Sequence, residues 1–259
     1  MTSTTDRMKI AARAALKACF GLVLMLALRQ VHADAPAAEW LATSRPPPGR
    51  VEIRYEVRWK GVPGAEGSYV LEHGNNRYSI TANAQGVGAF GLFDQLRIHQ
   101  SSEGEITPKG LVPKVFRNQR GSDASRLETA TFDWGAKLVS FAREGDSSQA
   151  SLPAGTLDQA ALLFQFAFAT SRGAEFSLPL ASGHDINVYE ISVLGDEQIE
   201  LPSGSVKTRH VRRQKGNRQL DVWLSLSAHL LPVRIRFDEG NGVTEFLSTT
   251  LTTGKAISP

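Results

Sequence analysis

Apolar and polar residues alternate over most of the chain after residue 50. In residues 51–59 (VEIRYEVRW) every odd position is apolar or aromatic and every even position is charged. A period of two over nine residues is typical of a strand with one face in the core and the other in water. Further stretches, most of them alternating, follow at residues 65–73, 77–85, 94–101, 126–134, 137–144, 185–195, 205–213, 219–227, 231–239 and 242–251.

Turn-forming sequences separate many of these stretches, among them HGNN, DWGA, LPSGS and DEGNG. Short strands at such spacing are typical of a meandering antiparallel sheet, whereas parallel sheets need helices between their strands. The sequence therefore predicts a mainly β fold with a single curved or barrel-like antiparallel sheet. Whether that sheet closes into a barrel stays open at this point.

One segment, TLDQAALLFQFAFATSRG, departs from the alternation and predicts a helix over about residues 156–172. Thr156 and Gln159 have the spacing of a capping box, Asp158 would lie in the first turn, and Arg172 before Gly173 resembles a helix end. Because the segment is apolar on nearly every side, the helix is expected to be buried, packed in the concavity of the sheet. We favour a core-filling helix that Thr156 and Asp158 cap. The alternative is a helix that lines or plugs a lipid-sized cavity, with Phe164, Phe168 and Leu163 as its ligand-binding residues.

The N-terminal segment has the pattern of a signal peptide. Four basic residues within residues 1–17 precede the apolar run ACFGLVLMLAL at residues 18–28. That run is shorter than the roughly 20 residues that a membrane span needs. Small residues at positions −3 and −1 of the sequence VHA predict cleavage before Asp34. An uncleaved N-terminal anchor is the less favoured alternative, and we expect export to the periplasm.

Removal of residues 1–33 changes the charge of the chain. The whole sequence has 29 basic and 26 acidic residues, but the mature chain would keep 24 and 25, a net charge of about −1. The single cysteine, Cys19, lies inside the apolar run, so neither a lipoprotein anchor nor a disulfide is expected in the mature chain. We expect a Pro-rich lead-in at 34–49, a β-rich domain at 50–253, a tail at 254–259, and no stable membrane span after cleavage.

The densest basic cluster, VRRQKGNRQ at residues 211–219, contains the Gly-Asn pair of a tight hairpin turn. We interpret Arg212, Arg213, Lys215 and Arg218 as the solvated end of a hairpin. Contact with an anionic envelope partner, such as phospholipid headgroups, is the alternative. Nucleic acid is not an expected partner. No aromatic residue that could stack on a nucleobase lies among these basic residues, and the mature chain has no net positive charge.

Candidate chemistry is sparse elsewhere. The sequence GVGAFG at residues 86–91 matches a dinucleotide-binding pattern, but a strand-like stretch follows it instead of a helix, so we predict a glycine-rich loop or bulge. Glu103 and Glu105 would share one face of a strand, as a pair of glycosidase carboxylates could. The histidines have no metal-ligand spacing and no serine-hydrolase elbow is present. We therefore assign no catalytic residue, no metal ligand and no cofactor.

Five motifs occur in an order and spacing that resemble a known family. They are SSEGEITPKGLVPKVF (101–116), TFDW (131–134), LPAGTLDQAALLFQ (152–165), LPSGSVKT (201–208) and DVWLSLSAHLLPVRIRF (221–237). Over about residues 51–251 the chain is similar to DUF3108, a bacterial exported family of unknown function. The resemblance implies a secreted β-rich domain of Gram-negative bacteria, and it supplies no functional residue.

Two hypotheses about function follow. The favoured one is a non-catalytic periplasmic protein that binds an apolar small molecule or lipid of the envelope, or an envelope protein. The alternative is a hydrolase that acts on envelope glycan or ester through loop carboxylates. A closed apolar cavity would favour binding, and an open groove with two facing carboxylates would favour hydrolysis.

Overall fold

The computed structural model describes residues 40–42, 46–171 and 175–255. The predicted signal peptide lies outside these residues, as do most of the lead-in, the expected helix stop at Arg172 and Gly173, and residues 256–259 of the tail. The described strands are β1 (Trp40–Ala42), β2 (Arg50–Trp59), β3 (Val62–Gly74), β4 (Arg77–Gly86), β5 (Ile98–Thr107), β6 (Gly110–Arg120), β7 (Glu128–Asp133), β8 (Leu138–Arg143), β9 (Asp146–Ser151), β10 (Leu157–Asp158), β11 (Ala169–Ser171), β12 (Glu175–Ala181), β13 (Ile186–Leu201), β14 (Gly204–Lys215), β15 (Arg218–Ser225), β16 (Pro232–Asp238) and β17 (Val243–Gly254). The described helices are α2 (Gln159–Phe168) and the short 3₁₀ helices η1 (Gly88–Leu92), η2 (Asp94–Leu96) and η3 (Ala124–Arg126).

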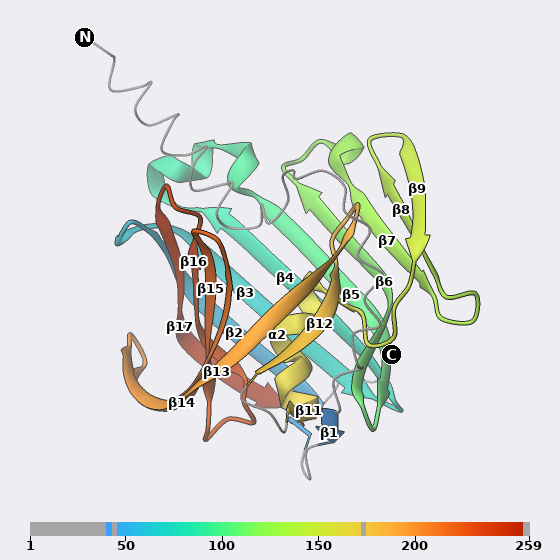
Figure 1. Cartoon of the computed structure of the whole chain (residues 1–259). Coiled ribbons are helices and arrows are strands. Elements are labelled where there is room, and N and C mark those ends of the chain that lie inside the picture. Colours follow the sequence, from blue (N-terminus) through green and yellow to red (C-terminus); the bar gives the residue numbers. More distant parts are fainter. Residues whose placement is uncertain (1–39, 43–45, 172–174, 256–259) are drawn as a thin grey trace.

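Fifteen of the described strands form one sheet, which curves around α2 (Figure 1). Its order is β10-β12-β13-β14-β15-β16-β17-β2-β3-β4-β5-β6-β7-β8-β9, and β1 and β11 form a separate pair. Among the described strands only β10 runs parallel to its neighbour. The prediction of a mainly β fold with one curved antiparallel sheet and a buried helix is confirmed. The sheet is open, although β10 contacts β6 across the opening.

Most of the predicted strands are present, and the differences have local causes. Residues 94–96 form η2 instead of the start of a strand. β6, β9 and β12 were not among the predicted strands. β6 and β12 each contain a proline, Pro113 or Pro179, which weakens the strand signal, and β9 (DSSQAS) has no apolar alternation. The loop prediction for GVGAFG is confirmed, since η1 joins β4 to η2 there.

The main core fills the space between the concave face of the sheet and α2. Strand β2 contributes Val51, Ile53, Tyr55 and Val57, each at most 4% exposed, as its alternation predicted. The charged residues between them face the outer side, where they form ion pairs such as Arg54–Glu52. The hydrophobic period thus decides which face of this strand turns to the helix.

The helix is shorter than predicted, and only one of its two predicted caps, Asp158, caps it. It spans Gln159–Phe168, because residues 157–158 pair with β12 and residues 169–171 pair with β1. Asp158 is the cap: its Oδ1 accepts hydrogen bonds from the backbone N–H groups of Ala160 and Ala161, at 3.0 and 2.8 Å. The Thr156 hydroxyl instead donates to the Pro153 carbonyl at 2.7 Å, so the predicted capping role of Thr156 is wrong.

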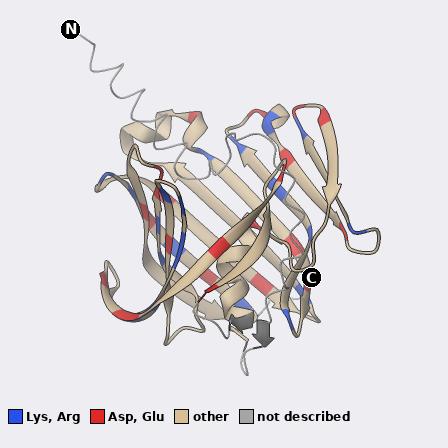
Figure 2. Ribbon diagram, viewed as in Figure 1, with Lys and Arg blue, Asp and Glu red and all other residues tan. Residues whose placement is uncertain are grey.

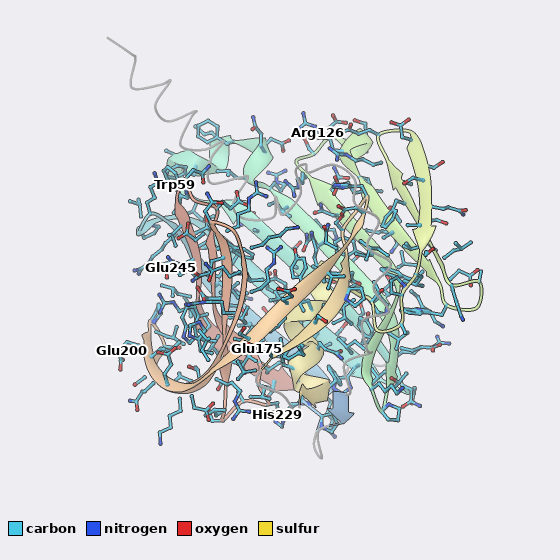
Figure 3. The ribbon with its side chains drawn as sticks, viewed as in Figure 1. Trp59, Arg126, Glu175, Glu200, His229 and Glu245 are labelled. Carbon is cyan, nitrogen blue, oxygen red and sulfur yellow. The ribbon has the colours of Figure 1, made fainter. Side chains whose placement is uncertain are left out.

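A second, smaller core lies on the outer face of the sheet. Strand β13 has a bulge next to Gly195, whose φ of +123° favours glycine. Beyond the bulge, the β13–β14 hairpin packs against the outer faces of β15, β16 and β17; Glu200 marks its end in Figure 3. The residues of this outer core are Ile199, Leu201, Trp223, Val233 and Leu247.

Candidate functional site

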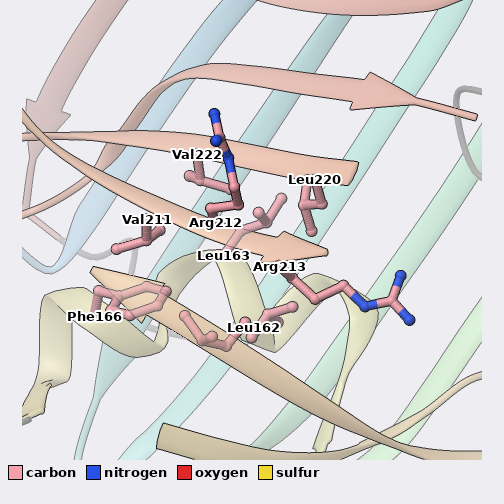
Figure 4. Close-up of a pocket in the computed structure, with 9 residues that line it drawn as sticks. Leu162, Leu163, Phe166, Val211, Arg212, Arg213, Leu220 and Val222 are labelled. Atoms are coloured by element: carbon pink, nitrogen blue, oxygen red, sulfur yellow. The ribbon is translucent and has the colours of Figure 1, made fainter. Parts of the chain in front are cut away.

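A partly open crevice separates α2 from the inner faces of β13, β14 and β15 (Figure 4). Its apolar lining comes from Leu162, Leu163, Phe166, Ile191, Val211, Leu220 and Val222, and Arg212 and Arg213 complete it. In its present form the crevice has room for about one water molecule. It is therefore a seam between two apolar surfaces, with basic residues beside it.

Polar contacts hold α2 to the other wall of the core, at β5 and β6. The only polar side chains on the helix are Gln159 and Gln165. Gln159 accepts a hydrogen bond from Gln100 of β5 at 3.4 Å. Gln165 accepts one from the Leu111 N–H at 2.8 Å and donates to the Lys109 carbonyl at 3.2 Å. The helix thus meets β5–β6 through hydrogen bonds and meets the crevice wall through Leu162, Leu163 and Phe166.

Gly110 makes the Gln165 contact possible. Its φ is +104°, and a Cβ placed there would lie 2.2 Å from Nε2 of Gln165. Any larger residue would displace the glutamine, so the β5–β6 turn is shaped to receive this side chain.

Asp158 adds a further contact on the same side. Its Oδ2 accepts a hydrogen bond from Ser102 Oγ at 2.5 Å, and Ser102 Oγ lies 3.0 Å from the Tyr78 hydroxyl. Burial raises the pKa of Asp158 to about 6, although the hydrogen bonds from Ser102, Ala161 and Ala160 oppose that shift. The three interacting side chains are almost completely enclosed, so this cluster anchors the start of the helix and offers no access to a substrate.

Arg213 is the charged residue on the crevice side of β14. It is only 6% exposed, and its guanidinium carbon lies 4.3 Å from the centre of the Tyr189 ring. Burial raises the pKa of Tyr189 to about 12, with Arg213 acting in the opposite direction, so this tyrosine stays neutral. Among the described residues, no acidic side chain forms an ion pair with Arg213.

Arg212, the preceding residue, leaves β14 in a different direction (Figure 4). Its Nε donates to Oδ1 of Asp221 at 2.6 Å, on the outer face of the sheet. Asp221 is 1% exposed and also accepts from Gln219 at 2.5 Å and from Arg236 at 3.2 Å. Burial tends to raise the pKa of Asp221, but the hydrogen bonds from Gln219, Arg212 and His210 outweigh it and leave the pKa below its usual range.

His210 extends this outer network. Its two ring nitrogens lie 2.8 Å from Asp221 and 2.9 Å from Glu197, and its ring stacks on Trp223 with a centroid distance of 4.3 Å. Trp223 also donates to Glu197 at 2.7 Å, and the guanidinium carbon of Arg234 lies over the Trp223 ring, 4.5 Å from its centre. The outer face of β14–β16 is thus an ion-paired layer beside the outer core.

The predicted hairpin turn in the basic cluster is therefore confirmed. The prediction that Arg212 and Arg213 are solvated is wrong. Lys215 and Arg218 flank the turn at Gly216 and Asn217 and are exposed. Arg212 is half-buried against Asp221, and Arg213 is buried against Tyr189, because both faces of β14 are covered before the strand reaches the turn. Figure 2 shows that residues of both signs are interspersed along the strands.

The three ligand-binding residues suggested on the helix are all buried but occupy different surroundings. Leu163 lines the crevice. Phe164 is fully buried, with its ring 6.0 Å from that of Tyr69, and the Phe168 ring lies edge-on to His73 at 5.1 Å. Only Leu163 of the three therefore faces the crevice.

Other candidates lie away from the crevice. Glu103 and Glu105 share the outer side of β5 as expected, where they pair with Arg117 and Lys114. The described residues contain no group of three or more His, Cys, Asp or Glu side chains placed to hold a metal ion. Within the same ranges, no helix combines the length and the apolar content that crossing a membrane requires.

Sequence reasoning missed Asp221 and Tyr189. One signal for Asp221 was present: Trp223 follows it on the face of β15 that the alternation assigns to solvent. A large aromatic residue there indicates that something covers this face. Tyr189 alternates regularly with its neighbours, so nothing in its sequence context distinguished it.

Comparisons with known proteins give a family and distant structural neighbours. A family model described as a protein of unknown function, DUF3108, matches residues 54–248. No significant match was found among curated proteins.

Among solved structures, a β-barrel-like protein of the domain of unknown function DUF1849 from Brucella abortus is 11% identical. It aligns over 78% of this chain and 96% of its own, with a TM-score of 0.49. A protein from Bacteroides fragilis described as exported, with a YmcC-like fold, is 9% identical over 83% of this chain and all of its own, with a TM-score of 0.31. A protein described as a lipoprotein from Parabacteroides distasonis is 11% identical over 85% of this chain and all of its own, with a TM-score of 0.27. None of the three assigns a function to this chain.

Proposed function

The chain belongs to the DUF3108 family of proteins of unknown function, and we propose that it is a non-catalytic binding protein of the cell envelope. In this proposal an apolar molecule enters the crevice between α2 and β13–β15. The observation that carries it is the one-sided attachment of the helix. All polar side chains of α2 turn to β5–β6, whereas the crevice is lined by apolar side chains on the helix side and, apart from Arg212 and Arg213, on the strand side.

The crevice must widen to receive such a molecule, since it now has room for about one water molecule. Widening separates the apolar side chains of α2 from those of β13–β15, and an acyl chain placed between them would restore the lost burial. The hydrogen bonds of Gln165 and Asp158 would keep the helix on the β5–β6 wall meanwhile. An apolar ligand would therefore enter on the crevice side of the helix, where no hydrogen bond has to break, and not on the β5–β6 side.

The place of action that we propose is the periplasm. Its basis is the signal-peptide pattern of residues 1–33, with small residues before Asp34. N-terminal sequencing of the exported protein is expected to begin at Asp34. A sequence that begins at Met1 would contradict both the cleavage and the periplasmic location.

Titration with a neutral apolar dye, N-phenyl-1-naphthylamine, tests binding in the crevice. We expect saturable fluorescence enhancement with the native protein. Val211→Phe should abolish it, because the larger ring would fill the crevice from β14. Val57→Phe is the matched control: Val57 is equally buried, at 4% against 3%, but does not line the crevice.

Both substitutions add similar volume to the core, so each is expected to lower stability by roughly 1–3 kcal/mol. Only Val211→Phe should remove dye binding. Equal loss in both variants would indicate a general effect of overpacking. Two results together would overturn the proposal: the native protein does not bind the dye, and mass spectrometry of protein purified from its host shows no bound ligand.

A further inference from the structure

We propose that Arg213 receives the anionic head of the bound molecule, so that the ligand is an anionic amphiphile: an apolar chain that ends in a carboxylate or phosphate. This inference rests on the proposed function, and it names the chemical class of the ligand for the same crevice. It begins from the position of Arg213 in the crevice lining, next to Val211 and Leu220.

The burial of Arg213 requires a physical reason. A guanidinium stays charged at every physiological pH, and burying a charge without a partner is unfavourable. Arg213 is 94% buried by residue surface, yet no acidic side chain of the described residues pairs with it. Its one described partner is the Tyr189 ring, and a cation–π contact offsets only part of the desolvation.

The nitrogens of Arg213 remain accessible to a ligand. None of them is among the fully buried polar atoms that lack a hydrogen-bond partner, whereas Nε of Arg234 is. Figure 4 shows the guanidinium of Arg213 pointing away from Leu163 and Phe166, and since its nitrogens are not fully enclosed, they keep some contact with solvent. An oxyanion can approach that head, and the planar guanidinium matches a carboxylate or phosphate with two parallel hydrogen bonds.

The neighbouring cation cannot serve instead. Arg212 donates to Asp221 on the outer face, so that buried carboxylate already neutralises it. The crevice therefore combines apolar walls with a single uncompensated positive charge. A neutral lipid would leave that charge unpaired, and a cationic amphiphile would be repelled by it.

Displacement of bound N-phenyl-1-naphthylamine by three ligands of equal chain length tests the inference. Dodecanoate and dodecyl phosphate represent the two sources of an anionic head, a free fatty acid and a phosphate-headed lipid. Dodecanol is the neutral reference. We expect at least one anion to bind about tenfold to a hundredfold more tightly than dodecanol, as charge-assisted hydrogen bonds allow, and the tighter of the two anions identifies the source.

Substitutions then assign the preference to Arg213. Arg213→Met should bring the affinity of the preferred anion down to that of dodecanol, and Arg213→Lys should retain part of the preference. Arg236→Met is the control: Arg236 pairs with Asp221 on the outer face but does not line the crevice, so this change should leave the preference intact. If Arg213→Met does not fold, the ligand series on the native protein and Arg213→Lys still decide the question.

The possible failures are distinguishable. If dodecanol binds as tightly as both anions, the assignment of Arg213 is wrong and its head is only turned to water, but the crevice still binds apolar molecules. If the preference persists in Arg213→Met, a different cation selects the head. If neither the dye nor any of the three ligands binds, the proposed function fails as well.

Discussion

Buried acidic side chains have different partners on the two faces of the sheet. On the outer face, Asp221 is 1% exposed and lies within hydrogen-bonding distance of Arg212, Arg236 and His210. On the inner face, Asp158 is fully buried and accepts hydrogen bonds only from neutral groups, Ser102 and two backbone N–H groups. The pKa of Asp221 is accordingly lowered, and that of Asp158 is raised to about 6.

The same contrast separates Arg212 from Arg213. They are neighbours in the chain, but alternation along β14 sends them to opposite faces. Arg212 joins the outer network, and Arg213 lies in the inner crevice with an aromatic ring as its described partner. Charged side chains on the outer face thus form ion pairs with one another. The inner face instead holds a cation, Arg213, with which no acidic side chain of the described residues pairs. This difference is the basis for the structural role that we assign to the outer charges and for the binding role that we propose for Arg213.

Phe164→Ala tests whether the inner face is held by packing. The Phe164 ring is fully buried, with Tyr69 beside it, and truncation of such a residue typically costs about 3–5 kcal/mol. We expect a loss of that size in urea unfolding. Leu92→Ala is the control, since Leu92 is 86% exposed and should change stability by no more than about 0.5 kcal/mol. A loss below about 1 kcal/mol for Phe164→Ala, with altered dye binding, would mean that this ring also faces a ligand cavity.

Asp221→Ala tests the outer network. Removal of one member of a buried ion pair leaves the remaining charges uncompensated, which costs about 3–5 kcal/mol when they cannot reach water. The side chains of Arg212 and Arg236 are 33% and 26% exposed, so we expect the lower end, about 3 kcal/mol, in the same unfolding assay. Asp238→Ala, which removes a more exposed partner of Arg236, should cost less than about 1 kcal/mol. Equal losses of stability for the two substitutions would show that Asp221 contributes no more to the network than Asp238 does.

The sequence allowed the inner face to be predicted better than the outer one. The period of two identified β2 and its buried residues, and the Gly-Asn pair located the β14–β15 turn, because both depend on local preferences. The outer network depends on the bulge at Gly195 and on a hairpin that then packs over β15–β17, which are tertiary features. The same reasoning explains the helix: its apolar segment was evident, but its ends are fixed by pairing of the flanking residues with β12 and β1.

Asp158→Asn tests the inner aspartate through pH. Because the folded-state pKa of Asp158 is raised, the folded protein retains a proton that the unfolded chain has already released between about pH 4 and pH 6. This group therefore makes the native protein less stable as the pH rises through that window. Asn cannot titrate, so we expect the variant to gain about 2 kcal/mol relative to the native protein between pH 4 and pH 6.5.

Asp221→Asn should show the opposite dependence. The folded-state pKa of Asp221 is lowered, so its stabilisation is complete above the ordinary aspartate value and is lost as the pH falls below it. The advantage of the native protein over this variant should shrink below about pH 4. Parallel pH curves for the two asparagine variants would contradict the contrast between the faces.

The smallest expected effect concerns the two arginines. Methionine preserves an unbranched stem and removes the charge. Arg212→Met leaves Asp221 without one of its hydrogen-bond donors, and with partial exposure of Arg212 we expect a loss of about 1–2 kcal/mol. Arg213→Met loses a cation–π contact but also removes an uncompensated buried charge, and these effects oppose each other. We therefore expect its free energy of unfolding to stay within about 1 kcal/mol of the native value in ligand-free protein.

A loss for Arg213→Met as large as that for Arg212→Met would make both arginines structural. A neutral result would mean that the fold does not need the charge at position 213, as the proposed role of Arg213 in binding an anion requires.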